Sequence, residues 1–229
     1  MPASERGGVT VHVPYPGLPD FAPKPQPPPR RGLPHPFEPV RPQEAEFDPF
    51  QRLYRRRIIM LGNRLDDAAA NDLVAKLVDL DAEDPEAEII LRLNCPGGSY
   101  SAMLAVYDAM DQVRAGVRTV CVGQAEGPAA VLLAAGAPGR RVMLPTAYAV
   151  LNQPTVEQPR TADATDATIE RDKAAWVRDQ VEAILAARTG QSKSQIHNDI
   201  ERPKLLNAED SVAYGLADEV QSRAAKSQQ

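Results

Sequence analysis

The sequence predicts an α/β fold in which parallel strands alternate with helices, and three observations lead to this prediction. Short apolar runs typical of buried strands alternate with stretches whose apolar residues recur every three or four positions. The connections between them are short, which favours parallel pairing through right-handed crossovers. The segment Cys121–Gly136 combines a buried strand end, a sharp turn and a helix rich in Ala and Leu. Many hydrolases carry a nucleophile on such a strand-to-helix elbow.

The size and composition are those of one globular domain with a tail. The 229 residues are 43% hydrophobic and 25% charged, which allows a sizeable core. No apolar run reaches membrane-spanning length and residues 1–10 lack the apolar core of a signal peptide, so we expect a cytoplasmic protein with no membrane partner. The net charge of −5 argues against nucleic acid as the main partner. Cys95 and Cys121 are too few for a disulfide framework or a zinc site, so we expect two reduced, buried thiols and neither a metal nor a cofactor.

The N-terminal 43 residues differ in composition from the rest of the chain. They hold 13 of the 22 prolines and carry a net charge of +2. Such a stretch forms neither helix nor interior strand, so we expect an extended or disordered arm. It either docks a partner through polyproline II structure or is a solvated or removable tail. Residues 44–222 then form the folded domain, and residues 223–229 a short tail.

After a transitional segment, 44–57, the pattern becomes regular. Five strands are expected at Arg57–Leu61, Ile89–Leu93, Val117–Val122, Arg141–Leu144 and Tyr148–Leu151. Asp66 or Asp67 can cap a helix that runs to about Asp81, because Pro85 stops it. Ser99 can cap the next helix, with Gly116 at its end.

Two further helices are expected towards the C-terminus. Thr165–Arg188 forms one long helix, and Asn207–Tyr214 forms a short one that Gly215 closes. The first is too long to be wholly covered by so small a core. We therefore expect part of it to project and pack against another subunit, although it could also lie across the sheet.

The elbow itself holds Glu126, Gly127 and Pro128. None of the three has the hydroxyl or thiol that a covalent nucleophile needs. The sequence therefore predicts the scaffold of a hydrolase site without its attacking group.

Several segments, in this order and at this spacing, resemble the proteolytic subunit of the Clp protease over about Glu44–Val220. They are Glu44–Leu61, Asn94–Ser99, Gly123–Ala125, Leu132–Ala137, Leu144–Pro145, Gln153–Pro154, Thr189–Gln191 and Tyr214–Leu216. The resemblance implies an αβ superhelix of the Clp-peptidase and crotonase type, with a handle helix at about 165–188. It further implies seven-membered rings that stack in pairs around a chamber, into which an AAA+ Clp unfoldase feeds unfolded polypeptide. Asp48–Tyr54 then lies near the unfoldase side, and the closeness of the Clp segments disfavours acyl-CoA chemistry of the crotonase kind.

The resemblance also places the catalytic positions of the family. The serine falls on Gly127, the histidine on Asn152 and the aspartate on Pro203. Glycine has no attacking group, the asparagine amide does not titrate, and proline cannot orient an imidazole. The oxyanion hole implied by the family uses a backbone N–H from the Gly97–Gly98 turn and one at Pro128, which has none.

Other positions keep their family character. Pro96–Gly98 either makes the turn that binds a substrate peptide as an added strand or serves packing alone. Glu201, Arg202 and Trp176 are candidates for contacts between rings. The leading hypothesis is a non-catalytic homologue, similar to the inactive ClpR-type subunits of plastids, which assembles with itself or with active paralogues.

Two alternatives remain open. One is a serine-type endopeptidase with a relocated site, for which Ser99, Ser101 and Glu126 are the candidate groups. His197 and Asp199 stand near Pro203, and we expect a solvated histidine there. The other is a peptide-binding module, in which the elbow groove holds a ligand without cleaving it.

Overall fold

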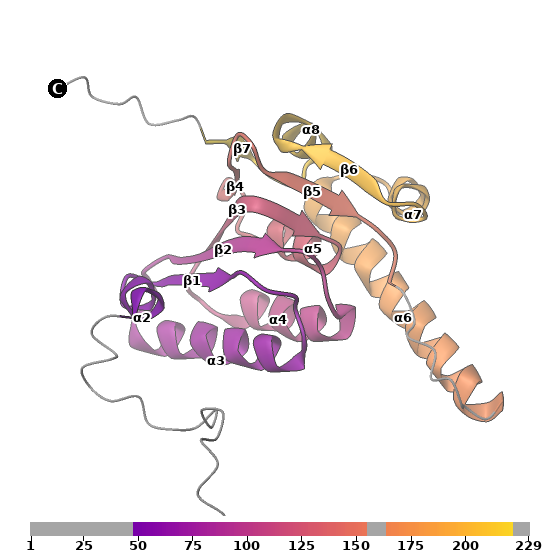
Figure 1. The fold of residues 1–229 in the computed structure, drawn as a ribbon, viewed down its shortest axis with the longest axis horizontal. Coiled ribbons are helices and arrows are strands. Elements are labelled where there is room, and N and C mark those ends of the chain that lie inside the picture. The colour runs from indigo at the N-terminus through magenta and orange to yellow at the C-terminus, as the bar shows by residue number, and fades with distance from the viewer. Residues whose placement is uncertain (1–47, 155–163, 222–229) are drawn as a thin grey trace, which may run out of the picture. The chain divides into compact units, whose positions relative to one another are not determined.

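The computed structural model describes residues 48–154 and 164–221, so the predicted arm and tail lie outside the described residues. Within these ranges a central sheet and seven helices form a mixed α/β fold (Figure 1). The helices are α2 (Pro49–Tyr54), α3 (Asp67–Glu83), α4 (Tyr100–Gln112), α5 (Pro128–Ala134), α6 (Ala164–Thr189), α7 (Lys193–Ile200) and α8 (Ala208–Tyr214). The strands are β1 (Ile58–Leu61), β2 (Ile89–Cys95), β3 (Val117–Glu126), β4 (Arg141–Met143), β5 (Tyr148–Leu151), β6 (Lys204–Asn207) and β7 (Glu219–Val220).

The longest strand of the sheet, β3, pairs with different neighbours along its two halves. The main path of the sheet runs β1-β2-β3-β4-β7 with parallel neighbours throughout. The first half of β3 pairs with β4, and its second half, Gln124–Glu126, pairs in parallel with Tyr148–Val150 of β5. The expectation of parallel strands is therefore confirmed on this path. The exception is β6, which the sequence did not predict and which pairs antiparallel with β5.

Two helix beginnings are capped as the sequence predicts. The Asp66 carboxylate accepts from the N–H of Ala69 at 2.8 Å, and the Ser99 hydroxyl accepts from the N–H of Ala102 at 3.1 Å. The expected end of α4 at Gly116 is wrong, because the helix stops at Gln112 and Val113 is already extended. The cause is distant in sequence: the Asp81 carboxylate on α3 accepts from the N–H groups of Arg114 and Ala115 and holds this segment out of the helix.

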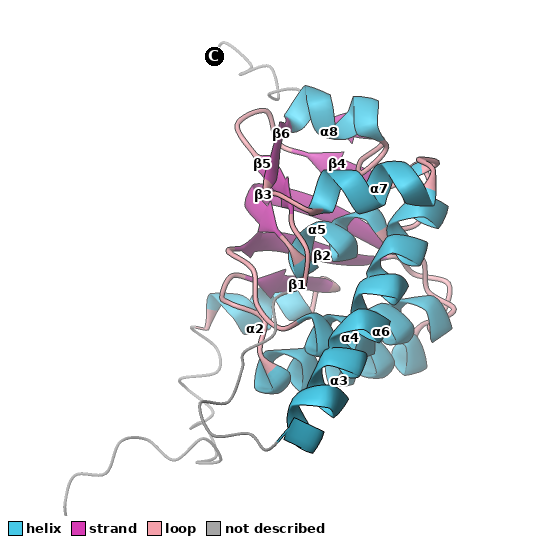
Figure 2. Ribbon diagram, turned by 90° about the vertical axis from the view of Figure 1, so that its right-hand side faces the viewer, coloured by secondary structure: helices cyan, strands magenta, loops and turns pink. Residues whose placement is uncertain are grey.

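The helices α3, α4 and α5 lie along one side of the sheet, and α6 crosses beside them (Figures 1 and 2). Every residue of α5 is buried, and so are the predicted inward residues Leu73 and Leu77 of α3 and Met103 and Val106 of α4. Both cysteines are free and buried, as expected. Burial raises the pKa of the Cys121 thiol to about 12, so this group is an inert part of the core.

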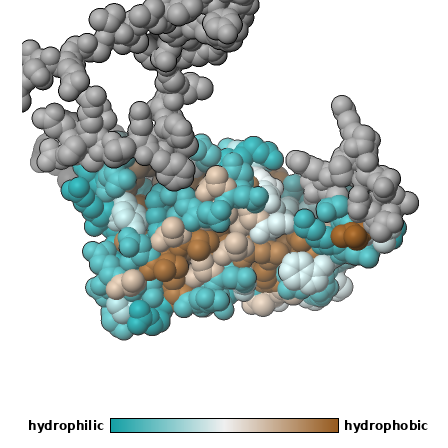
Figure 3. Space-filling model, turned by 90° about the horizontal axis from the view of Figure 1, so that it is seen from below, coloured by the Kyte–Doolittle hydropathy of each residue, from teal (hydrophilic) through white to brown (hydrophobic). Residues whose placement is uncertain are grey.

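The helix α6 is covered over only part of its length. Val177 is the first buried residue of its described side chains, whereas Ile169 and Trp176 are 59% and 58% exposed. The expectation that the core covers only part of this helix is thus confirmed. Seen from below, apolar side chains form a band across the described part of the chain, bordered by hydrophilic residues (Figure 3). Of the described helices, none combines the length and apolar character needed to cross a membrane.

One guanidinium ties the C-terminal ends of three helices together. Arg141 on β4 donates to the carbonyl oxygens of Arg188 and Gly215 at 2.8 Å each, and to that of Ala134 at 3.5 Å. It also pairs with the Asp218 carboxylate at 2.5 Å. Carbonyl groups at helix ends lack partners within the helix, so this contact satisfies three such ends at once.

Candidate functional site

The elbow is formed where β3 passes into α5. Gly127 has φ 52° and ψ −111°, a left-handed conformation that favours glycine. Its N–H donates to the carbonyl oxygen of Val150 at 2.8 Å, and its own carbonyl oxygen accepts from the N–H of Ala130 at 3.0 Å. Pro128 follows as the first residue of α5 and supplies no N–H. The predicted turn is therefore present, with a proline in place of one amide donor.

The sheet brings the three predicted triad positions together. Asn152 follows β5 directly, and a β-carbon at position 127 would lie only 2.6 Å from the Asn152 Oδ1 atom. In the antiparallel ladder, Leu151 faces Lys204. Asn152 directly follows Leu151 and Pro203 directly precedes Lys204, so both lie one residue beyond this last pair of the ladder. The antiparallel strand that the sequence analysis missed thus delivers the third position to the site.

Tyr100 also belongs to this site, and the sequence analysis did not single it out. Its hydroxyl lies 2.5 Å from the main-chain oxygen of Asn152 and 2.9 Å from the side-chain oxygen. The same hydroxyl is 3.1 Å from the position of a β-carbon at residue 127. Burial raises the pKa of Tyr100, so the phenol stays protonated and donates. The one available signal was its place, immediately after a Gly-Gly turn and a helix cap.

The Gly97–Gly98 turn is fixed by backbone hydrogen bonds to Leu65. The N–H of Leu65 donates to the oxygen of Gly97 at 2.9 Å, and the N–H of Ser99 donates to the oxygen of Leu65 at 2.7 Å. Gly97 and Gly98 have φ values of 101° and 149°, and a β-carbon on Gly98 would lie 2.2 Å from the oxygen of Leu65. Packing therefore requires glycine at position 98, and strand addition by a peptide stays a prediction.

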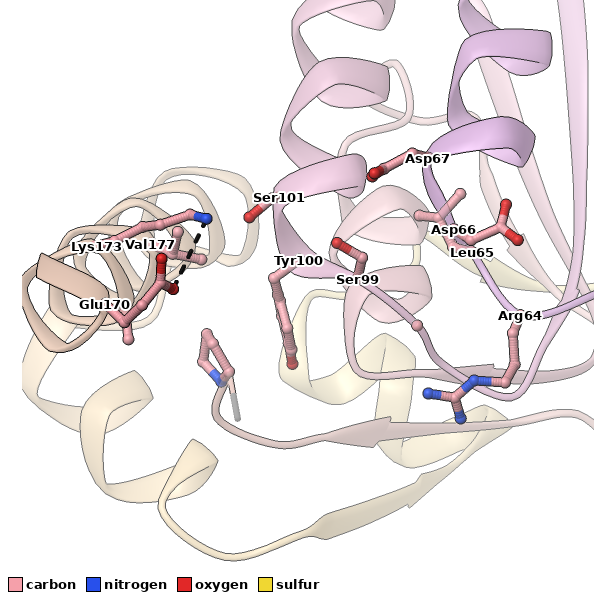
Figure 4. Close-up of a pocket in the computed structure, with 13 residues that line it drawn as sticks. Arg64, Leu65, Asp66, Asp67, Ser99, Tyr100, Ser101, Glu170, Lys173 and Val177 are labelled. Carbon is pink, nitrogen blue, oxygen red and sulfur yellow. Dashed lines mark ion pairs between the residues drawn. The ribbon is translucent and has the colours of Figure 1, made fainter. Parts of the chain in front are cut away.

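A cavity of about 590 Å³ opens beside this turn, between the beginnings of α3 and α4 and one side of α6 (Figure 4). Its walls include Ser99, Tyr100 and Ser101 from α4 and its cap, and Val177 from α6. Glu170 and Lys173 also border the cavity and pair with each other at 3.9 Å. The walls are thus largely polar and carry both signs of charge.

Two of the three groups considered for a relocated peptidase site, Ser99 and Glu126, have structural partners. Ser99 caps α4, and Glu126 accepts from the Tyr148 hydroxyl at 3.2 Å. Burial alone would raise the pKa of Asp199, but hydrogen bonds from Lys204, Gln195 and Tyr214 outweigh it and leave this pKa below its ordinary value. The Asp199 carboxylate is thus hydrogen-bonded to neighbouring residues of α7, β6 and α8.

His197 is exposed, as expected of a solvated histidine, with 53% of its side chain accessible, but it also has a partner that the sequence did not indicate. Its Nδ1 atom lies 2.8 Å from Oε1 of Glu182, a carboxylate that also pairs with Arg178 at 2.9 Å. Arg178 in turn donates to the side-chain oxygen of Gln153 at 2.7 Å. His197 is therefore part of a contact between α6 and α7. Glu201 and Arg202, the predicted ring-contact pair, follow α7 and are exposed, as Trp176 is.

The fold and the elbow define an α/β protein with the framework of a hydrolase. The family model of the Clp protease matches residues 41–224, and the chain belongs to this family. It is 44% identical over 175 residues to the ATP-dependent Clp protease proteolytic subunit 2 of Streptomyces coelicolor, an alignment that covers 76% of this chain and 80% of that protein. It is 43% identical to proteolytic subunit 1 of Corynebacterium diphtheriae, covering 76% of this chain and 83% of the relative. Proteolytic subunit 1 of Tropheryma whipplei is 41% identical, with 76% and 84% covered.

Proposed function

We propose that this chain is a non-catalytic subunit of an ATP-dependent Clp degradation complex. It builds heptameric rings, alone or mixed with active paralogues, in the cytoplasm. The rings stack around a chamber into which an AAA+ unfoldase passes unfolded polypeptide. The contribution of this chain lies in its interfaces, which set chamber capacity, unfoldase docking or activation.

The observation that carries the proposal is the arrangement of Gly127, Pro128 and Asn152. The elbow keeps the backbone turn of a hydrolase site, with Gly127 at φ 52°. The three residues lack a nucleophile, an amide donor and a titratable proton acceptor respectively. Loss of one oxyanion donor alone typically costs on the order of 10²–10³ in rate. Together these changes support an assembly role.

Exposed apolar side chains support the assembly part of the proposal. Trp176 and Ile169 are spaced by two helical turns on α6, where no described buried residue precedes Val177. Relatives at 41–44% identity are named as proteolytic subunits of a Clp protease, which supports a role of this chain in such a complex.

The experiment that tests the proposal combines labelling with native mass spectrometry. The purified chain is treated with a fluorophosphonate probe, alone and mixed with an active Clp proteolytic subunit. We expect label only on the active partner, and rings that contain this chain. Covalent labelling of this chain at a defined residue would contradict the non-catalytic assignment, and monomers under every condition would contradict the assembly role.

Three variants separate the alternatives. Peptide turnover that survives purification and disappears in Ser99→Ala or Glu126→Gln would support a relocated peptidase site instead. Deletion of residues 1–43 should leave ring formation intact under the proposal. A binding module that recruits its partner through the arm would lose partner capture in the same deletion.

A further inference from the structure

We propose that Tyr100 closes the former catalytic centre, so that this chain excludes polypeptide from the elbow as well as lacking the groups to cleave it. The inference rests on the proposed function and deepens it. It assigns to Tyr100 the role of a fixed plug between the elbow and the adjoining cavity.

The first argument is the space that the hydroxyl occupies. It lies 3.1 Å from the position of a β-carbon at residue 127. A reacting carbonyl has to approach a nucleophile on that carbon to about 3–3.5 Å, from the open side of the elbow. Two non-bonded heavy atoms cannot share this volume. As long as Tyr100 keeps its position, its hydroxyl takes up part of the space that a substrate carbonyl needs beside residue 127.

The second argument is that the phenol is fastened in this position. Its single hydrogen faces both oxygens of Asn152, at 2.5 Å and 2.9 Å. The main-chain oxygen of Asn152, unlike its side-chain amide, cannot rotate away from the Tyr100 phenol. Because burial raises the pKa of the phenol, the donor is retained throughout the ordinary pH range. Figure 4 shows the ring projecting from the beginning of α4 at the wall of the cavity.

The third argument is that Gly127 and Asn152 are fitted to Tyr100. A β-carbon at residue 127 would come within 2.6 Å of the Asn152 side-chain oxygen, and the amide would have to leave its contact with the phenol. Glycine at this position is therefore a requirement of the Tyr100–Asn152 pair. The three residues form one closed arrangement, which indicates more than the loss of a nucleophile.

The cavity determines what removal of the plug should do. Tyr100 forms one wall of this cavity of about 590 Å³, whereas Gly127 and Asn152, which its hydroxyl approaches, are not among the lining residues. Replacing the ring by a smaller side chain joins this cavity to the elbow. Because the cavity borders Gly98, we expect the joined space to admit an extended peptide beside the Gly97–Gly98 turn.

The test measures binding of a fluorescein-labelled, unfolded casein-derived decapeptide by fluorescence anisotropy. The variants are Tyr100→Leu and Tyr100→Ala, with Tyr100→Phe to keep the ring and Ser101→Ala as a matched change in the same cavity wall. We expect the original chain and Ser101→Ala to bind weakly, and Tyr100→Phe, which keeps the ring without its fastening hydroxyl, to bind more tightly than the original chain but less tightly than the two small variants. Tyr100→Leu and Tyr100→Ala should bind at least tenfold more tightly.

Comparable affinity in the original chain and in both small variants would overturn the proposal. If Tyr100→Ala fails to fold, as judged by circular dichroism, Tyr100→Leu decides the outcome. Hydrogen exchange of the original chain gives an independent reading, since protection of the Gly97–Ser99 amides on adding peptide would also overturn the proposal. Native mass spectrometry on the same samples separates the two conclusions, because intact rings with peptide bound in the original chain refute only the plug.

Discussion

The hydroxyl of Tyr100 lies 2.5 Å from the main-chain oxygen of Asn152, so the first residue of α4 is fastened to the residue that follows β5. The next residue, Gln153, accepts a hydrogen bond from Arg178 of α6. Two consecutive residues after β5 are thereby tied to two different helices. These two contacts connect β5 to α4 and α6 at the elbow, which is consistent with the proposed assembly role.

The first prediction concerns the elbow glycine. Gly127→Ser should neither react with a fluorophosphonate nor hydrolyse peptides, because the described atoms nearest to a β-carbon at position 127 belong to the Asn152 amide and the protonated Tyr100 phenol, and neither serves as a general base. It should also lower the free energy of unfolding by about 1–3 kcal/mol, since a non-glycine residue is strained at φ 52° and its β-carbon displaces Asn152. Denaturant unfolding and probe labelling measure the two effects.

A glycine elsewhere in the chain serves as the control for strain alone. Gly139 has φ 77° and no atom within 4 Å of an added β-carbon. Gly139→Ala should therefore cost less than Gly127→Ala, and the difference reports the displacement of Asn152. Equal losses at the two positions would contradict the proposed contact.

The second prediction concerns the guanidinium that joins three helix ends. The Arg141 and Asp218 side chains are 11% and 22% exposed, so Arg141→Met leaves a shielded carboxylate without its partner. We expect a loss of about 3 kcal/mol in the free energy of unfolding. The neighbouring Arg140 pairs with Glu88 and is 56% exposed, so Arg140→Met should cost less than about 1 kcal/mol. Similar losses in the two variants would refute this role of Arg141.

Much of the fold could be predicted from the sequence because its signals are local. The caps at Asp66 and Ser99 bind N–H groups within the first turn of their helices. The apolar faces of α3 and α4 repeat within one or two helical turns. The triad positions could be placed because the flanking segments resemble the family. Short-range reasoning was sufficient wherever the cause of a feature lay close to it in the chain.

Most of the features that the sequence did not predict depend on residues far apart in the chain. The end of α4 is set by Asp81, 33 residues before Arg114. Tyr100 and Asn152 are 52 residues apart, so no spacing rule reveals their contact. The strand β6 has only four residues, and its two adjacent leucines, Leu205 at 66% exposure and buried Leu206, break the alternation of apolar and polar residues that marks a strand. Features that depend on such distant partners appear only in the folded chain.

The third prediction is a pH dependence of stability. The hydrogen bond from Arg141, together with the charge of the guanidinium, holds the pKa of Asp218 below its usual range. A carboxyl whose pKa is lower in the folded state stabilises fully above its unfolded pKa of about 3.9, and this contribution is lost as the pH falls through the folded value. The stability difference between the original chain and Asp218→Asn should therefore be largest near neutral pH and shrink below about pH 4. Urea unfolding from pH 7 to pH 3 measures this difference, and one that does not change with pH would contradict the assignment.

The fourth prediction uses the single tryptophan of the chain as a reporter of assembly. Trp176 is 58% exposed on α6, so covering it in a subunit contact moves its fluorescence emission to shorter wavelength. Burial of a side chain of this size contributes about 2 kcal/mol per subunit, so Trp176→Asp should weaken assembly at least tenfold. A dilution series followed by emission and by native mass spectrometry should give one common midpoint. Trp176→Phe controls for the loss of the indole, because it keeps an apolar ring and should still assemble. Rings that form while the Trp176 emission stays unchanged would show that assembly uses another surface and leaves this side of α6 in solvent.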